Sequence, residues 1–411
     1  MSACLGLMIC VTALSAVSST AAEPADDGVI RDKFGNVVSS PGAKQASGDM
    51  VRDALTVQAA RNAAVAARGK KAWYEPRWDL SDLPHYRPEH QVSGKLCIWG
   101  NNYIRDGRLE EYWTEGFRKY HPQIEFDNYL PTTAIGLSAL TCGAADIGMS
   151  RRCTFLELLA FQRLHKVDPL EIPAVTGALD VPGWTPGFAI FVNKANPIKG
   201  LSMKQLDGIF GGPRLGGWVG TEWHPEFARG KEQNIRTWGQ AGLTGEWADK
   251  TINVYAVSMR YNSTYLFADI VLKSSDQYNE DMRCYANYQK PDGTLVAWFD
   301  QMREALDNDP YGINYSFLNA ITPKTKALPI QVADGGPYIE MTYDTVREHL
   351  YPLYTEQYFY INRQPGKPLD PKVKEFVRYV LSQEGQNEVQ RDGKYLPLTA
   401  KTVRENLKKL D

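Results

Sequence analysis

The sequence has no excess of basic residues. Its 411 residues include 46 Lys and Arg against 48 Asp and Glu, a formal net charge of −2. A protein that binds nucleic acid non-specifically needs such an excess to displace counterions from the phosphate backbone, so we expect no nucleic-acid partner. Long hydrophobic runs are also missing after the first 22 residues, which argues against a polytopic membrane protein. With 43% hydrophobic and 23% charged residues, the composition is that of a globular protein of two or three domains.

Catalytic and metal-binding motifs are missing as well. The six histidines show no His-Glu-x-x-His spacing, and the chain has neither a phosphate-binding P-loop nor a Gly-x-Ser-x-Gly nucleophile elbow. We therefore expect no enzymatic activity, no metal and no cofactor. A secreted phosphohydrolase is the weakest alternative, because it needs a metal or a nucleophile that the sequence does not offer.

Cysteine is scarce, at six residues, and two of these lie in the apolar N-terminal segment as Cys4 and Cys10. The others form no Cys-x-x-Cys pair and stand too far apart for a zinc ribbon. Four cysteines allow three pairings, and the sequence does not choose among them. The two interpretations are a structural bridge or buried small residues, and the cysteines concerned are Cys97, Cys142, Cys153 and Cys284.

Residues 1–22 are typical of a signal peptide. An almost uncharged apolar run is followed by small residues, with cleavage expected near Ala21 and Ala22, although no Lys or Arg precedes the run. No lipoprotein cleavage pattern precedes either N-terminal cysteine, so we expect no lipid anchor. The signal peptide therefore predicts an exported, periplasmic protein. Residues 23–90 are predicted to be an extension, with one Ala-rich helix over 50–68 and then a strap of Pro and aromatic residues on the main body.

From Gly94 onward, short apolar runs alternate with amphipathic stretches. This alternation is typical of doubly wound α/β units and predicts an α/β fold. The loop over 211–236 is long enough to be functional or ordered against a neighbour. The predicted strands are 95–100, 124–130, 145–149, 188–192, 252–256, 313–315, 326–330 and 358–362. The predicted helices are 109–117, 134–140, 203–210, 264–272, 295–306 and 371–382.

Two α/β blocks lie on either side of residue 185 with no pure linker between them. This arrangement predicts two doubly wound lobes joined by crossing strands. We expect residues 91–185 and 325–411 to form lobe 1, and residues 186–324 to form lobe 2.

A series of short phrases, all in one order, then carries a family resemblance over about 94–399. The phrases are VNKANPI at 192–198, QLDGIF at 205–210, TWG at 237–239, LTGEW at 243–247, ALPI at 327–330, YPL at 351–353, LSQEGQ at 381–386 and YLPLT at 395–399. Together they resemble the phosphate-binding-protein family of periplasmic solute receptors for ABC transporters. The resemblance implies a type II periplasmic binding protein fold, two lobes that close on an oxyanion, a permease partner in the inner membrane and a monomer.

Four polar loops at predicted strand and helix ends are candidates for the anion site. Backbone N–H groups and hydroxyls at helix N-termini hold oxyanions well, and these termini meet at the carboxyl ends of the strands. An arginine adds a forked donor that matches an oxyanion. The candidate ligands are Asn101, Asn102, Tyr103, Thr132, Thr133, Ser150, Arg151, Arg260, Asn262, Ser263 and Thr264.

Each loop also has a simpler interpretation. Asn, Ser and Thr are good helix N-caps, and Arg151 with Arg152 reads equally as a solvated surface pair. Residues 262–264 also spell a glycosylation sequon. The agreement of four loops across two lobes favours the anion site.

The loops depart from the family pattern at several positions. Family members usually carry Ser or Thr where this chain has Asn101 and Asn102, and Ser-Gly-Thr where it has residues 262–264. An arginine usually stands at the position of Ser258, and the nearest one here is Arg260. Where many phosphate receptors place an acid that accepts the ligand's proton, this chain has Arg151.

The loss of that acid leaves the ligand open. Phosphate is the leading candidate, and sulfate, another tetrahedral oxyanion or a small organic phosphate are the others. The altered loops and the added extension also support an alternative, a surface or regulatory protein that keeps the fold with a degenerate or different ligand site.

Overall fold

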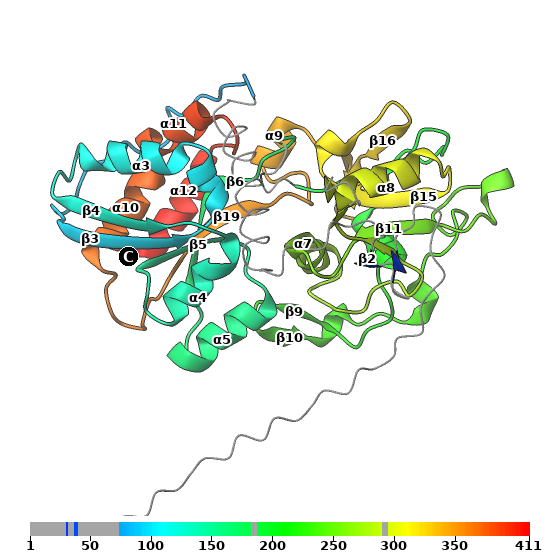
Figure 1. Ribbon diagram of the computed structural model, residues 1–411, viewed down its shortest axis with the longest axis horizontal. Helices are drawn as coiled ribbons and strands as arrows, with labels where there is room; N and C mark the ends of the chain where they lie inside the picture. The colour runs from blue at the N-terminus through cyan, green and yellow to red at the C-terminus, as the bar shows by residue number, and fades with distance from the viewer. Residues whose placement is uncertain (1–29, 32–36, 40–73, 182–183, 185–186, 290–294) are drawn as a thin grey trace, which may run out of the picture.

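The computed structural model describes residues 30–31, 37–39, 74–181, 184, 187–289 and 295–411. The predicted signal peptide and the predicted helix over 50–68 lie outside these residues. Figure 1 shows two α/β lobes side by side, each built on a five-stranded sheet. The predicted fold class, two α/β lobes joined by crossing segments, is confirmed.

The sheet of lobe 1 has the strand order β4-β3-β5-β19-β6. Strand β3 pairs parallel with β4 and β5, whereas β19 runs antiparallel to β5 and β6. Helices α3, α10, α11 and α12 cover one face and α4 and α5 the other (Figure 1). The strands are β3 (Gly94–Gly100), β4 (Ile124–Tyr129), β5 (Ile147–Arg151), β6 (Leu170–Thr176) and β19 (Glu356–Ile361). The helices are α2 (Asn102–Asp106), α3 (Leu109–Arg118), α4 (Gly136–Thr141), α5 (Phe155–His165), α10 (Pro371–Val380), α11 (Gln383–Asp392) and α12 (Ala400–Leu407), and the 3-10 turn η1 (Thr133–Ile135) precedes α4.

The sheet of lobe 2 has the order β12-β11-β15-β7-β16, with β7 antiparallel to both of its neighbours. Its strands are β7 (Ala189–Asn193), β11 (Asn253–Val257), β12 (Arg283–Tyr285), β15 (Gly312–Ser316) and β16 (Thr325–Leu328). Its helices are α6 (Met203–Phe210), α7 (Asn262–Val271) and α8 (Trp298–Asp307). Smaller pairings are β8 (Leu201–Ser202) with β17 (Ile330–Gln331) and β18 (Tyr338–Ile339), and β9 (Gly217–Val219) with β10 (Glu222–His224); α9 (Tyr343–Arg347) follows β18.

The boundary between the lobes differs from the sequence-based prediction. Residues 325–328 were expected to begin the return of the chain to lobe 1. Instead they form β16, which pairs along β7. Strands β17 and β18 also lie beyond 324: β17 pairs with β8 of lobe 2, and β18 pairs with β17. A strand-like segment cannot be assigned to one of two sheets from its own residues, because its partner is chosen by long-range pairing.

Two chain segments cross between the lobes and are hydrogen-bonded to each other. The Gly177 N–H donates to the Thr355 carbonyl at 2.6 Å, and the Phe188 N–H donates to the Leu353 carbonyl at 2.8 Å. These bonds join the segment that enters lobe 2 to the segment that leaves it. We call residues 177–181, 184, 187–188 and 350–355 the hinge.

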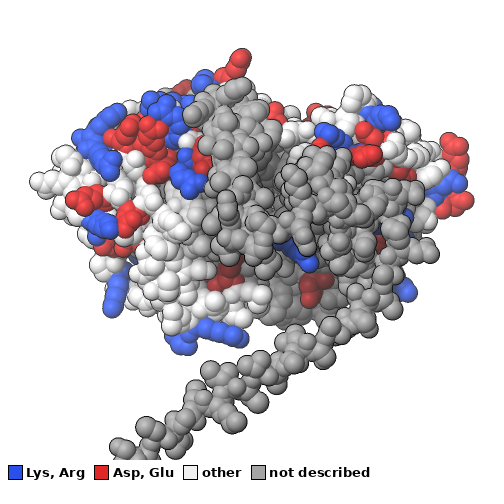
Figure 2. Space-filling view, in the orientation of Figure 1, with Lys and Arg blue, Asp and Glu red and all other residues white. Residues whose placement is uncertain are grey.

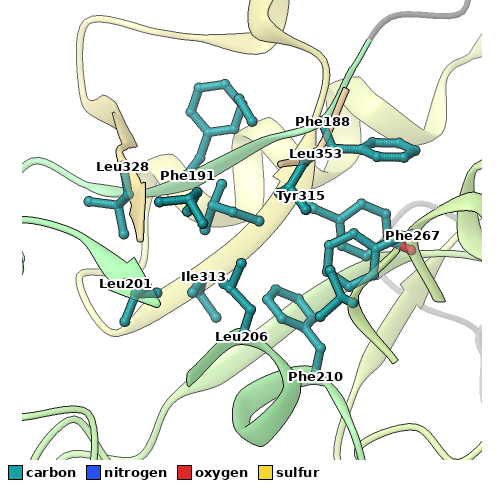
Figure 3. Packing of buried hydrophobic residues seen from close by; sticks show 14 of the residues in the cluster. Phe188, Phe191, Leu201, Leu206, Phe210, Phe267, Ile313, Tyr315, Leu328 and Leu353 are labelled. Carbon is teal, nitrogen blue, oxygen red and sulfur yellow. The ribbon is translucent and has the colours of Figure 1, made fainter. Parts of the chain in front are cut away.

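The core of lobe 2 fixes helix α7 on its sheet. Phe267 of α7 stacks on Tyr315 of β15 with ring centroids 3.8 Å apart, and Phe188 and Phe210 meet the same Tyr315 ring edge-on (Figure 3). All four side chains are buried, and burial of each large apolar side chain stabilises the fold by about 1.5–3 kcal/mol. This packing holds the start of α7 at the face of lobe 2 that meets lobe 1.

The described part of the strap, residues 74–92, lies against lobe 1. The buried hydroxyl of Tyr86 donates to Glu375 Oε2 of α10 at 2.7 Å and lies 2.7 Å from His121 Nε2. The surface of this lobe carries Lys and Arg interspersed with Asp and Glu (Figure 2), in keeping with the balanced net charge. No helix in the described ranges is long and apolar enough to cross a membrane.

Candidate functional site

The loop after β3 is organised by the side chain of Asn101, which is fully buried. Asn101 Oδ1 accepts the Tyr103 N–H at 2.9 Å and so caps α2, while its Nδ2 donates to Gln357 Oε1 at 2.5 Å. Asn102 turns to Asp106 instead, with its Nδ2 3.1 Å from Oδ2. The predicted cap and the predicted site residue are therefore the same residue, and Asn101 uses its amide to position Gln357.

The second loop is fastened to the end of β5. Thr132 is exposed and caps η1 by accepting the Ala134 N–H at 3.4 Å, whereas Thr133 is buried. Ser150 Oγ donates to the Thr133 carbonyl at 2.8 Å. The Ser150 hydroxyl proton is thus used within lobe 1, and it holds the Thr133 turn beside Arg151.

Arg151 ends β5 and reaches from lobe 1 to lobe 2. It is only 4% exposed. Its Nη1 donates to the Arg152 carbonyl at 2.8 Å and lies 3.3 Å from Glu157 Oε2, while its Nη2 donates to Asn262 Oδ1 at 2.8 Å. This is not the solvated surface arginine that its sequence context also allowed, because three partners in two lobes hold the guanidinium.

Two buried N–H donors at this position are unpaired, one on Arg151 itself and one on its neighbour Gln357. Gln357 lies directly opposite Arg151 in the antiparallel pairing of β19 with β5 and is fully buried. Among the residues that the structure describes, Arg151 Nε and Gln357 Nε2 have no hydrogen-bond partner. Buried polar groups in proteins nearly always have a hydrogen-bond partner. Two neighbouring donors without one therefore mark a position where an acceptor oxygen fits.

The start of α7 supplies the lobe 2 side of the site. Asn262, Ser263 and Thr264 lie inside the helix and not at its N-cap, which is Tyr261 and has no side-chain capping bond. The start of α7 therefore has no capping side chain, and the positive end of the helix dipole lies at Asn262, whose side chain contacts Arg151 of lobe 1. The Thr264 hydroxyl is fully buried and lies 3.0 Å from both the Val257 and Ser258 carbonyls, so its proton is used inside lobe 2.

The structure brings Arg151, Asn262 and the Ser150–Thr133 pair to one inter-lobe position and leaves Arg260 aside. Arg260 is exposed, and its backbone N–H donates to Ser258 Oγ at 3.4 Å. The roles of these residues as anion ligands are predictions.

Sequence reasoning missed Gln357 and Glu157. Gln357 sits in a strand whose other residues are also buried, and its only signal was a lone amide just before an aromatic strand. Glu157 forms a capping box with Thr154, accepting its N–H at 2.7 Å, which is a recognisable motif. Its proximity to Arg151 depends on the turn between β5 and α5.

The cysteines and acidic residues do not add a metal site to the described part of the chain. All four described cysteines are free, so the structural bridge, one of the two interpretations, is not formed; of the four, only Cys153 is buried, as the other interpretation requires. Burial raises the pKa of the Cys153 thiol, next to β5, which keeps it protonated and unreactive. In the described ranges, no group of three or more His, Cys, Asp or Glu is placed to hold a metal ion.

Comparison with known proteins finds a family model, the PBP superfamily domain, that matches residues 108–384. The phosphate-binding protein PstS of Pseudomonas aeruginosa is 31% identical over 329 residues, which are 80% of this chain and 90% of that protein. Protein SphX of Synechococcus elongatus is 23% identical over 71% of this chain and 75% of its own. The crystal structure of PstS from Borrelia burgdorferi aligns with a TM-score of 0.48 and 16% identity, covering 75% of this chain and all of that one. The family match contains the β5 end, the start of α7 and Gln357.

Proposed function

The chain belongs to the PBP superfamily, and on that basis we propose that it is a periplasmic phosphate-binding protein that captures phosphate between its two lobes for an ABC transporter. The relative that supports this proposal is itself named a phosphate-binding protein and aligns over 80% of this chain. Because the 329 aligned residues exceed the length of either lobe, the alignment includes parts of both lobes and is not a similarity of one lobe alone.

The single observation that carries the proposal is the pair of buried donors, Arg151 Nε and Gln357 Nε2. Each is enclosed, and each lacks a partner among the described residues. Leaving a buried donor unpaired costs about 1–3 kcal/mol, and more for a charged group. An oxyanion seated between β5 and α7 supplies acceptor oxygens to both donors and removes that cost.

The surrounding groups explain how such an anion is held. The Arg151 guanidinium supplies positive charge, the Thr133 and Ser263 hydroxyls are available as neutral donors, and the first turn of α7 contributes backbone N–H groups. Asn101 fixes the orientation of the Gln357 amide, because its Nδ2 donates to Gln357 Oε1 at 2.5 Å. With Oε1 occupied, Gln357 presents only N–H toward the anion.

Ligand binding and lobe closure are one event in this proposal. Arg151 belongs to lobe 1 and Asn262 to lobe 2, so the arginine is fully positioned only when the lobes meet. The hinge provides two hydrogen-bonded crossing segments about which the lobes can turn. An anion that contacts both lobes then shifts the population toward the closed form.

The remaining features of the proposal concern the setting. We propose export to the periplasm with cleavage near Ala21 and Ala22, a monomer, delivery to an inner-membrane permease, and binding of the anion without chemical conversion. The roles of Asn102, Tyr103, Thr132 and Arg260 are secondary in this site, since the structure gives their side chains other contacts or exposes them.

Titration calorimetry on the full chain, refolded after removal of bound ligand, tests the function. We expect phosphate to bind in a 1:1 ratio and to raise the melting temperature, and a phosphate ester to bind far more weakly because its organic group clashes with the closed lobes. Absence of heat and of any thermal shift with phosphate contradicts the proposal. Hydrolysis of the ester contradicts the absence of catalysis.

A further inference from the structure

A hairpin of lobe 2 lies against a helix of lobe 1, outside the anion site. It consists of β9 and β10, residues 217–224, in the insertion between α6 and β11, and we call it the clasp. The Trp218 ring of the clasp packs on the Phe155 ring of α5 with centroids 4.5 Å apart. Gln162 Nε2 of α5 donates to Thr221 Oγ1 at 3.1 Å. Figure 1 shows β9 and β10 beside α5, beneath the gap between the lobes.

The base of the clasp is fixed rigidly to lobe 2. Arg214, which is 9% exposed, makes a two-point bond to Asp207 of α6 with both distances at 2.6 Å. The Trp218 N–H donates to the Lys273 carbonyl just after α7 at 2.8 Å. Because the base is held by a buried ion pair and by the backbone, movement of lobe 2 carries the hairpin with it.

The clasp and the anion site touch lobe 1 at separate points. The bond between Arg151 and Asn262 lies at the anion site, whereas Arg152 Nη1 and Asp269 Oδ2 pair at 3.1 Å nearer to the clasp. A cavity of about 320 Å³ lies between the clasp, α7 and the hinge, and its lining includes Trp218, Val219 and Tyr354. The clasp contact is therefore not continuous with the anion contacts, and each can be altered without the other.

We propose that Trp218 and Thr221 are positioning residues for anion capture, which hold the lobes closed from outside the site and so set how long the anion stays bound. The inference rests on the proposed function only where the test measures the release of phosphate. Trp218 contacts Phe155 of the opposite lobe and is braced on its other side by Trp223, whose ring centroid is 5.0 Å away. Opening the lobes must break the ring contact and the Thr221 bond, whereas anion entry into an open molecule involves neither.

The first test measures phosphate release by stopped flow from the wild type and from Trp218→Ala and Thr221→Val. An aromatic pair contributes enough beyond buried area to predict a release rate about fivefold to tenfold faster for Trp218→Ala, with the association rate within about twofold. Thr221→Val should give a smaller increase of about twofold to fivefold, for one neutral hydrogen bond. The matched control is Leu215→Ala, because Leu215 lies in the same insertion and is 87% exposed.

The second test asks whether the contact acts between the lobes. Phe155→Ala should accelerate release like Trp218→Ala, and the double variant should do no more than either single change, since both remove one contact. Small-angle scattering of the anion-free chain should show a larger radius of gyration for Trp218→Ala than for the wild type or Leu215→Ala. Thr221→Val keeps this test valid if Trp218→Ala fails to fold.

Unchanged release rates together with unchanged scattering in Trp218→Ala and Thr221→Val overturn the inference. Additive effects of Phe155→Ala and Trp218→Ala overturn the assignment of the contact to lobe closure. If the wild type binds no phosphate, the proposed function fails, and the scattering of the anion-free variants still decides whether the clasp holds the lobes together.

Discussion

Arg151 and Asn262 are 111 residues apart in the chain, and the arginine Nη2 donates to the asparagine Oδ1 at 2.8 Å across the two lobes. The donor ends a strand of lobe 1 and the acceptor lies in the first turn of α7 in lobe 2. The bond joins the two elements that the anion must contact, so it links the geometry of the site to the closure of the molecule.

Replacing Arg151 should weaken phosphate binding more than removal of any other single charge. Arg151→Lys keeps the positive charge but loses Nε and the forked geometry, and the loss of a charge-assisted bond predicts an affinity about 10- to 100-fold lower by calorimetry. Arg163→Lys makes the same exchange at the exposed end of α5 and should leave the affinity within about twofold. Equal affinities for Arg151→Lys and the wild type contradict the placement of the site.

Ser263 and Thr264 should respond differently although they are neighbours. Thr264→Val removes the one buried hydroxyl proton that the Val257 and Ser258 carbonyls share, which predicts a loss of about 1–3 kcal/mol in unfolding free energy. Ser263→Ala should instead lower phosphate affinity about fivefold and leave the melting temperature within about 1 °C. Melting curves and titrations of the two variants check this; a destabilised Ser263→Ala with normal affinity reverses the assignment.

Selectivity between phosphate and sulfate should be weak. Acceptor atoms near the site are already used: Gln357 Oε1 accepts from Asn101, Asn262 Oδ1 accepts from Arg151, and Glu157 Oε2 accepts from Thr154. Sulfate has no proton to donate, and these three acceptor atoms are already engaged, so they cannot use that difference. We expect sulfate to compete with phosphate with a dissociation constant within about tenfold, by competition calorimetry at pH 7.5.

The variant Glu157→Gln tests whether the Glu157 carboxylate accepts the proton of phosphate. If sulfate fails to compete, a carboxylate must accept the phosphate proton, and Glu157→Gln should then lower phosphate affinity and restore sulfate competition. If sulfate competes as expected, Glu157→Gln should leave the ratio of the two affinities unchanged.

The stability of lobe 1 should fall as the pH drops below about 6.5 because of His121. This ring is fully buried, Nδ1 accepts the Val92 N–H, and Nε2 lies against the Tyr86 hydroxyl. Burial lowers the pKa of His121, which the nearby Glu375 opposes only in part. The unfolded chain therefore binds the proton first, so stability is complete above pH 6.5 and declines below it, by at most about 1.4 kcal/mol per pH unit.

Urea unfolding at pH 7.5 and 5.5 measures this effect. The loss of unfolding free energy between the two values should be smaller in His121→Gln than in the wild type, since glutamine does not titrate. His90→Gln is the matched control, because His90 lies in the strap that contacts His121 but is itself exposed. An identical loss in His121→Gln and the wild type rules out His121 as the titrating group.

Local patterns in the chain were enough to predict most of the strands of the two five-stranded sheets, and the family. The apolar run before Gly100 and the helical spacing over 371–380 gave correct elements because burial of one side of an element leaves a periodic signal. The phrases of the resemblance identified the superfamily. The element ends moved by one to three residues, since caps depend on neighbouring chain; thus α7 begins at Asn262, two residues before the predicted start.

Only the tertiary structure decided which polar groups meet. Gln357 gains its place from the register of β19 against β5, which pairs it with a residue 206 positions earlier. Long-range pairing also placed β16 in lobe 2, and tertiary packing set Trp218 against Phe155. The length of the loop over 211–236 indicates only that it is functional or ordered against a neighbour. A strand or loop carries its own propensity in its residues, whereas its partner is selected by the free energy of the whole packed molecule, and no segment contains that information alone.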